Sequence, residues 1–266
     1  MCLLLAGPFF YLLGLTLYAQ TSNYSAQIFT LAIRDQQGQF VTDIQPNQIV
    51  ITGQGAKVQR LELDNAPRRI VLLLDTSGSM GNYKSLTWSN VAHVAIQIAL
   101  QRKGDDSIGL ETLAERDQIL VPLTTDSQLL VRHIEALTSS GRGRTMLGLA
   151  LRNILARREN GLRFGDAIVL VSDGYRSQED KTDFAQLDHD LTRAGVRICL
   201  IRVQPVMGFG AYSEVSDASY FVRDVGGTTL NMFSMLEEVH PGDGVHVAPE
   251  MIESTAQAAY GFVRTD

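Results

Sequence analysis

Cysteine is almost absent from this chain, and its scarcity excludes two classes of structure. Only Cys2 and Cys199 occur among the 266 residues. Cys2 belongs to an apolar N-terminal segment with the character of an export signal, so cleavage of that segment would leave Cys199 alone. Cys199 lies in an apolar strand pattern, where a thiol behaves as a small hydrophobe. Neither a disulfide framework nor a cysteine metal site is therefore expected.

Excess positive charge and clustered aromatic side chains are also missing. The formal net charge is −6, and aromatic residues make up 7% of the chain without gathering in one stretch. A net negative chain has no overall attraction for nucleic acid, and scattered aromatics form no platform for stacked bases. Hydrophobic content of 45% with 20% charged residues is typical of a folded globular protein, and the length allows one large domain with a smaller one.

Common enzyme motifs do not occur in the sequence. It contains no Gly-x-x-x-x-Gly-Lys-[Ser/Thr] phosphate loop, no Gly-x-Ser-x-Gly nucleophile turn and no His-Glu-x-x-His zinc helix. The five histidines are scattered, and none accompanies an evident nucleophile. We therefore expect a protein that is not an enzyme.

The first nineteen residues lack any charged side chain. This apolar segment, residues 1–19, is followed by polar Gln20-Thr-Ser-Asn and has the pattern of a secretory signal peptide. Its start has no Lys or Arg, and Leu17-Tyr-Ala19 puts a large residue where cleavage sites prefer a small one. An uncleaved N-terminal anchor is the alternative. Both interpretations predict an exported protein, periplasmic or extracellular, which in the second case residues 1–19 hold at the membrane.

The most informative stretch that is present is an apolar run ending in polar residues. Residues 70–74 are all aliphatic, as in a strand buried on both faces at the centre of a parallel sheet. Asp75, Ser77 and Ser79 follow at alternate positions of a short loop, where their oxygens can converge on one point. Oxygen donors of this kind are preferred by Mg²⁺, and the carboxyl edge of an open α/β sheet is where ligands bind.

Two later segments complete the pattern. The glycine-rich loop 141–145 ends at Thr145 and leads into a helical pattern, and the apolar stretch 167–172 ends in Asp173-Gly174. Taken singly, Asp75 or Asp173 is an ordinary turn acid, and Ser77, Ser79 or Thr145 is an ordinary turn or helix-capping residue. Their occurrence in this order on these elements favours one metal site.

Together the three segments resemble the metal-ion-dependent adhesion site of von Willebrand factor type A domains, over roughly residues 67–240. The resemblance implies one divalent ion, Mg²⁺ or else Mn²⁺ or Ca²⁺, since all accept oxygen ligands. It implies that three hydroxyls bind the ion and that two acids bind it directly or through water. The matching positions are Asp75, Ser77, Ser79, Thr145 and Asp173.

The resemblance also implies a function, a metal-dependent protein-binding module of the adhesion type. One coordination position would be completed by an Asp or Glu carboxylate of a protein partner. Arg142, Arg144 and Arg176 flank the predicted site and would favour such an anionic ligand, although they are equally explained as solvated loop charges. Neither nucleic acid nor, apart from residues 1–19, membrane is expected as a partner.

Two other functions compete with this one. Similar domains occur as non-catalytic subunits of chelatase-type or secretion-type complexes, although a signal peptide argues against the cytosolic versions. A metal-dependent hydrolase is the second alternative, because an acid that ends a buried strand also begins phosphotransferase motifs. The usual second acid of those motifs is replaced here by Ser77.

The remaining sequence predicts a Rossmann-like α/β fold, with a doubly wound, mostly parallel sheet flanked by helices. The short connection 114–117 between strands 107–113 and 118–123 requires one antiparallel edge strand. Helices are expected to include residues 91–99, 232–239 and 249–260.

The domain organisation predicted from these patterns has four parts. Residues 1–19 form the signal or anchor, 20–66 a small β-rich module, 67–240 the type A domain, and 241–266 a C-terminal loop and helix. The β-rich module before the metal strand, with turns at Asp35-Gln-Gln-Gly38 and Gly53-Gln-Gly55, resembles bacterial exported proteins known as von Willebrand factor A-related.

Overall fold

The computed structural model describes most of the chain after residue 66. The described residues are 44–50, 58, 60, 66–82, 86–137, 143–157, 161–205, 217–224, 226–234 and 247–264. The expected signal segment 1–19 and most of the expected β-rich module 20–66 lie outside them. Within that module the structure shows a short 3-10 helix, η1 (Pro46–Gln48), followed by Ile49 in extended backbone. Among the described residues no helix has both the length and the apolarity needed to cross a membrane.

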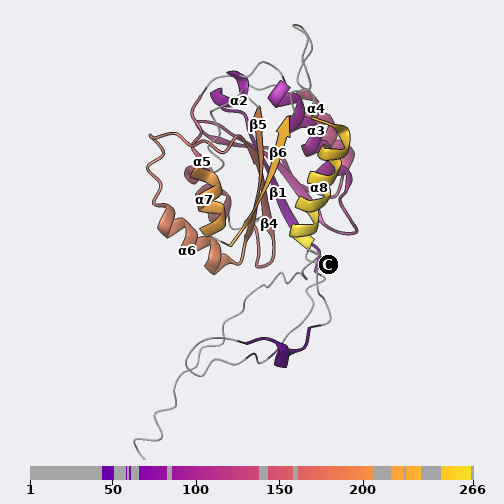
Figure 1. Cartoon of the computed structure of the whole chain (residues 1–266), viewed down its shortest axis with the longest axis vertical. Coiled ribbons are helices and arrows are strands. Elements are labelled where there is room, and N and C mark those ends of the chain that lie inside the picture. Colours follow the sequence, from indigo (N-terminus) through magenta and orange to yellow (C-terminus); the bar gives the residue numbers. More distant parts are fainter. Residues whose placement is uncertain are drawn as a thin grey trace, which may run out of the picture. The chain divides into compact units, whose positions relative to one another are not determined.

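A six-stranded sheet forms the centre of the domain, in the order β3-β2-β1-β4-β5-β6 (Figure 1). β3 runs antiparallel to β2, and every other neighbouring pair is parallel. The predicted fold class and its single antiparallel edge strand are therefore confirmed. The strands are β1 (Arg69–Asp75), β2 (Ser107–Leu113), β3 (Asp117–Thr124), β4 (Ala167–Ser172), β5 (Arg197–Pro205) and β6 (Thr228–Ser234).

Helices cover both faces of this sheet, as Figure 1 shows. One layer packs on the face that includes Leu72 and Val169, and the other on the face that includes Leu73 and Leu170. The first layer contains α3 (Leu86–Leu100), α4 (Ser127–Ala136) and α8 (Pro249–Arg264). The second contains α5 (Leu147–Ala156), α6 (Phe184–Ala194) and α7 (Asp217–Asp224), while α2 (Gly78–Asn82) follows β1 directly.

The unbroken apolar run of β1 is explained by this double coverage. Leu72 and Leu74 pack toward α3, whereas Val71 and Leu73 pack toward α5, so every position of the strand after Arg69 is buried. Each fully buried aliphatic side chain stabilises the fold by about 1.5–3 kcal/mol. The strand therefore holds the loop that follows Asp75 on a rigid central element.

Local capping residues mark the ends of two helices. The Asp126 carboxylate caps α4 by accepting a hydrogen bond of 3.0 Å from the backbone N–H of Leu129. Gly195 ends α6 in the left-handed conformation, at φ 63°. A Cβ at Gly195 would also come within 2.2 Å of the Phe164 ring, so glycine is required there for space as well as for conformation.

The prediction of a helix at residues 232–239 is wrong at its start, because Met232 belongs to β6. β6 pairs in parallel with β5, and Met232 lies opposite Val203. The β-branched residues Thr228 and Thr229 favour a strand, and the register turns Met232 fully into the core beneath α8. Residues 235–239 lie outside the described residues.

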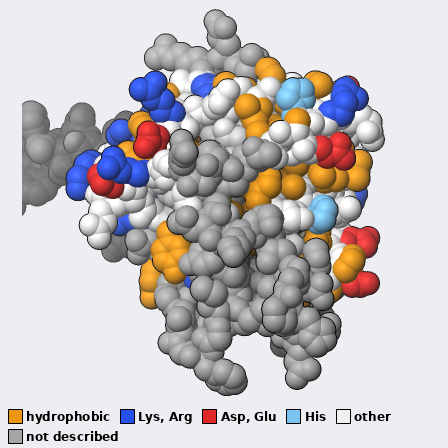
Figure 2. Space-filling view, turned by 90° about the horizontal axis from the view of Figure 1, so that it is seen from above, with side chains coloured by type: hydrophobic (Ala, Val, Ile, Leu, Met, Phe, Trp, Pro, Cys, Tyr) orange, Lys and Arg blue, Asp and Glu red, His pale blue; other side chains and the backbone are white. Residues whose placement is uncertain are grey.

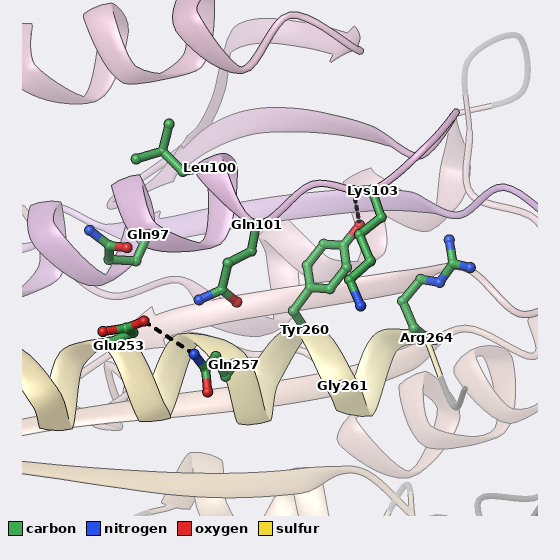
Figure 3. A pocket seen from close by; sticks show the side chains of 9 residues that line it. All are labelled: Gln97, Leu100, Gln101, Lys103, Glu253, Gln257, Tyr260, Gly261 and Arg264. Carbon is green, nitrogen blue, oxygen red and sulfur yellow. Dashed lines mark hydrogen bonds between the residues drawn. The ribbon is translucent and has the colours of Figure 1, made fainter.

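The last helix is longer than expected and belongs to the sheet domain. α8 continues to Arg264, and its apolar face, including Ala256 and Val263, joins the same core as α3. Figure 3 shows the groove between these helices, where Tyr260 points toward Lys103 and accepts a 2.8 Å hydrogen bond from its backbone N–H.

Buried Asp106 fixes the end of α8 in place. Its carboxylate accepts hydrogen bonds from the Tyr260 hydroxyl and from Arg264 Nη1, the latter at 3.1 Å to each oxygen. Arg197, at the start of β5, also donates to the carbonyl oxygens of Phe262 and Val263. The C-terminal turn of α8 is thus held by charged hydrogen bonds, which are stronger than neutral ones.

Candidate metal centre

The site lies where the carboxyl ends of β1 and β4 meet. The chain passes from β1 outward to β2 on one side and to β4 on the other, so the strand order reverses between these two neighbours. Such a switch point is where open α/β sheets bind ligands. Asp75 is the last residue of β1, and Asp173 directly follows β4. Figure 2 views the domain from this end.

Asp75 is completely buried, and both of its carboxylate oxygens accept hydrogen bonds. The backbone N–H of Ser77 donates to Oδ1 at 2.9 Å, which closes a tight turn after the strand. The Ser172 hydroxyl, at the end of β4, donates to Oδ2 at 2.6 Å. Asp75 is therefore held in one orientation by a neighbouring loop and a neighbouring strand.

Three hydroxyl groups lie next to one another beside this carboxylate. Ser77 Oγ is 3.2 Å from Ser79 Oγ, and Thr145 Oγ1 donates to Ser77 Oγ at 2.8 Å. Thr145 is not the cap of the following helix, because α5 begins at Leu147 with Met146 in the N-cap position. The Thr145 hydroxyl is therefore used at the site.

Backbone hydrogen bonds hold the Thr145 loop against its neighbours. The N–H of Gly78 donates to the Gly143 carbonyl at 3.0 Å, and the N–H of Ser177 donates to the Thr145 carbonyl at 2.9 Å. The first of these bonds reaches the loop after β1, and the second reaches the segment after β4. All three loops are thereby connected around one point.

Asp173 supplies the second carboxylate of the site. Its Oδ1 accepts a hydrogen bond of 3.0 Å from the backbone N–H of Tyr175. Its Oδ2 is buried and accepts no hydrogen bond from any described residue. A buried carboxylate oxygen without a partner is costly, and a bound cation would remove that cost.

The raised pKa values of the two acids also indicate a site for a cation. Burial raises the pKa of Asp75 from 3.8 to about 7, with the negative charge of Asp173 as the next cause and hydrogen bonds from Ser172 and Ser77 opposing it. Burial likewise raises the pKa of Asp173, an effect partly offset by the Ser79 hydroxyl, by the Tyr175 N–H and by the positive charge of Arg202. Two buried acids that repel each other are stabilised as anions by a divalent ion between them.

All five residues predicted as metal ligands therefore come together at one edge of the sheet. Carboxylate and hydroxyl oxygens in this mixture fit a hard divalent ion such as Mg²⁺, Mn²⁺ or Ca²⁺. Within the described part of the chain, no group of three or more His, Cys, Asp or Glu side chains forms a metal cluster elsewhere or here. The site combines only two acids with three hydroxyls.

The predicted arginine rim is described in part. Arg142 lies outside the described residues. Arg144 is mostly exposed and lies 3.4 Å from Glu179, and the Arg176 guanidinium lies 4.5 Å from the centre of the Phe184 ring. Figure 2 likewise shows side chains of both signs on the left, the side of α5 and α6. The positive charge of Arg144 is therefore partly neutralised by Glu179, whereas Arg176 packs on an aromatic ring.

Two residues of the site were missed by the sequence-based prediction. Ser172 is the last residue of the apolar stretch 167–172, and Arg202 lies in the apolar strand pattern around Cys199. Arg202 is only 2% exposed and interacts electrostatically with Asp173 and Tyr175. The signal for both is a polar residue near the end of an otherwise aliphatic strand, at the edge where the predicted ligands gather.

Comparison with known proteins identifies the fold. A family model described as the von Willebrand factor type A domain matches residues 70–176, a range that contains all five predicted ligands. No protein in a search of curated sequences matches significantly.

Several solved structures are similar to this chain. An aerotolerance-related membrane protein from Bacteroides fragilis is 13% identical, with a TM-score of 0.52 over 75% of this chain and 100% of its own. BatB from Bacteroides thetaiotaomicron is 14% identical, with a TM-score of 0.51 over 74% and 99%. Proximal thread matrix protein 1 from the mussel byssus, solved with a zinc-occupied adhesion-site motif, is 17% identical, with a TM-score of 0.51 over 74% and 47%. At these identities the likeness shows the Rossmann-like type A fold.

Proposed function

We propose that this protein is a divalent-metal-dependent binding module. The observation that carries the proposal is the buried Asp173 Oδ2, which has no hydrogen-bond partner among the described residues and lies in the site formed with Asp75 and three hydroxyls. A bound ion would be held by Asp75, Ser77, Ser79, Thr145 and Asp173. It would supply a positive centre that attracts an anionic ligand.

The small number of acids supports binding of a partner carboxylate. Hydroxyl ligands carry no charge, so an ion held by Ser77, Ser79 and Thr145 keeps more of its own charge than one in an all-carboxylate cage. A protein side chain of Asp or Glu is the ligand that fits this chemistry. The zinc in the mussel byssus protein supports metal binding by this fold, while the donor set here favours Mg²⁺ or Mn²⁺, with Ca²⁺ as the third choice.

The surface next to the site supports a protein partner. Tyr175, directly after the Asp173-Gly174 turn, is 54% exposed, and Arg144 and Arg176 are exposed nearby. Tyrosine and arginine are enriched at the centres of protein interfaces. A carboxylate on the metal with Tyr175 beside it would combine one charged contact with apolar area.

The proposal includes that the protein is not an enzyme. The described histidines His93, His133 and His189 lie exposed on α3, α4 and α6. The acids of the site are held by hydrogen bonds from Ser172, Ser77 and Tyr175. A role as a non-catalytic subunit of a larger assembly is compatible with the same binding chemistry.

Export is a further part of the proposal, and N-terminal sequencing of the exported protein tests whether residues 1–19 are removed.

Calorimetric titration with Mn²⁺ tests the metal site. We expect one ion per chain in the wild type and at least about tenfold weaker binding in Asp173→Asn, because one ligand charge is lost. Asp224→Asn is the matched control, since Asp224 is an exposed acid on α7 paired with Arg223. Equal Mn²⁺ affinity of the wild type and Asp173→Asn would refute the site. In the wild type, a chelator should abolish partner binding while the far-UV spectrum stays unchanged.

A further inference from the structure

We propose that Arg202 supplies a permanent positive charge to the metal centre, and that this charge makes metal binding and carboxylate binding depend on each other. The inference rests on the proposed function above. It assigns to Arg202 a role in setting ligand specificity, acting through charge and without touching the ligand.

The register of the sheet places Arg202 in line with the site. Ser172 of β4 is the parallel partner of Arg202 of β5, and Ser172 in turn donates its hydroxyl hydrogen to Asp75 of β1. Neighbouring strands are about 4.8 Å apart. Asp75, Ser172 and Arg202 therefore form a row across three strands at the edge where the ion would bind.

The three side chains also share one face of the sheet. Ile198 and Leu200, which precede Arg202 by even steps, pack into the core beneath α5, α6 and α7. Alternation along a strand puts Arg202 on that same face. The backbone N–H of Ala218, in the first turn of α7, donates to the Gly174 carbonyl at 3.3 Å, so the start of α7 is bonded to the turn that follows Asp173.

Burial gives the Arg202 charge an electrostatic range that a surface arginine lacks. Its side chain is almost completely shielded from water, in contrast to the mostly exposed Arg144. Charges on exposed side chains are screened by solvent and salt, whereas buried charges are screened much less. Arg202 also interacts electrostatically with Asp173, so its field acts on the metal centre itself.

A charge count gives the consequence. Among these three groups, Asp75 and Asp173 contribute two negative charges when ionised and Arg202 one positive charge, so together they carry one net negative charge without metal. A divalent ion changes the total to one net positive charge. Without Arg202 the loaded site would be neutral. Arg202 therefore repels the metal when no ligand is present and strengthens the attraction for a carboxylate once the metal is bound.

This arrangement couples the two ligands. A carboxylate on the metal cancels the excess positive charge, so each ligand increases the affinity of the other by the same factor. The site would hold its ion loosely alone and firmly with its partner. A metal-binding surface of this kind selects anionic partners by charge before any other contact is made.

Titration of Mn²⁺ with and without sodium acetate, at constant ionic strength, tests the inference. In the wild type we expect acetate to tighten Mn²⁺ binding by about threefold or more. Arg202→Gln should bind Mn²⁺ alone about threefold or more tightly than the wild type and should lose most of the acetate effect. Arg202→Lys keeps the charge and should behave as the wild type. Arg223→Gln, which removes an exposed charge of α7, is the control.

The outcomes separate this inference from the proposed function. A wild type that binds no Mn²⁺ overturns the metal site and the role of Arg202 together. A wild type that binds Mn²⁺ without any acetate effect overturns the inference and the proposed carboxylate ligand but leaves the metal site standing, even if no Arg202 variant folds. Loss of Mn²⁺ binding in both folded Arg202→Gln and folded Arg202→Lys also overturns it, because Arg202 would then only position Asp173.

Discussion

The Ser172 hydroxyl donates a 2.6 Å hydrogen bond to Asp75 Oδ2 and accepts a 3.0 Å hydrogen bond from the backbone N–H of Gly174. Ser172 therefore connects the end of β1 to the turn that carries Asp173. The N–H of Gly174 fixes the hydroxyl so that its proton points to the carboxylate. One uncharged side chain thus sets the relative orientation of the two acids of the metal centre.

Removal of this hydroxyl should weaken metal binding without removing a ligand. Partners that orient metal ligands typically contribute 10- to 100-fold in affinity, so we expect Ser172→Ala to bind Mn²⁺ about tenfold more weakly by calorimetry. Ser254→Ala is a matched control, because Ser254 is an exposed residue of α8 that bonds only a local carbonyl. Unchanged affinity in Ser172→Ala would show that Asp75 is oriented without it.

The metal-free protein should become less stable as the pH rises through the range of Asp75. Its folded pKa is raised from 3.8 to about 7, first by burial and then by the charge of Asp173. Between these values the folded protein holds a proton that the unfolded chain has lost, so stability present at the acidic end is lost toward pH 7.

Urea unfolding in the presence of a chelator measures this effect. The Asp75 contribution to the free energy of unfolding should fall by roughly 2–4 kcal/mol between about pH 4 and about pH 8, because each pKa unit corresponds to about 1.4 kcal/mol. The difference between the wild type and Asp75→Asn isolates this group from the others that titrate. Parallel pH profiles of the two proteins would contradict the assignment. Mn²⁺ competes with the same proton, so its affinity should fall below about pH 7.

A buried ion pair away from the metal centre should contribute to stability. Glu111 of β2 is nearly inaccessible, and its Oε2 accepts a 2.8 Å hydrogen bond from Arg157 Nη2, which also reaches Asp117 at 2.8 Å. Glu111→Gln leaves the guanidinium with one acid only. We expect a loss of about 1–3 kcal/mol in the free energy of unfolding.

The measurement for this pair is urea unfolding at neutral pH. Glu253→Gln serves as the control, because Glu253 is exposed on α8 and bonds only Gln257 one turn away. A Glu111→Gln protein as stable as this control would show that the pair only balances its own desolvation.

The hydroxyl of Tyr260 should hold the end of α8. Tyr260→Phe removes the donor to Asp106 and the acceptor for the Lys103 N–H. We expect a loss of about 1–3 kcal/mol and faster amide hydrogen exchange in the last two turns of α8, with metal affinity unchanged. Tyr220→Phe, at an exposed position of α7, is the control. Unaltered exchange in Tyr260→Phe would assign the attachment to Arg264 and Arg197 alone.

Much of the fold could be predicted because strong local patterns agree with the tertiary structure. The aliphatic run before Asp75 can only be a doubly covered strand or a core helix, and the abrupt polar loop decides for the strand. The short connection 114–117 leaves no room for a crossover helix, so β3 had to be antiparallel. Asp126 and Gly195 mark helix ends by capping chemistry that needs no tertiary information.

Prediction fails where the role of a residue depends on how its strand pairs with the neighbouring strands. Met232 fits the apolar stripe of a short helix as well as a strand, and only the pairing with Val203 of β5 decides. Ser172 and Arg202 are single polar residues in aliphatic strands. Their role becomes visible when the alignment of β1, β4 and β5 brings both to the level of Asp75. A sequence gives the face of a strand but not which neighbour lies beside it.

Asp106 has a mechanical consequence beyond its contribution to stability. It accepts a 2.8 Å hydrogen bond from the backbone N–H of Arg68, just before β1, and also binds Arg264 at the end of α8. The chain thus enters and leaves this domain side by side, at the sheet edge opposite Asp75. A pull on residues 68 and 264 would load these contacts of Asp106, which lie at the opposite end of the strands from the metal centre. We therefore expect a partner bound at the metal centre to be little affected by a pull on the two ends of the domain.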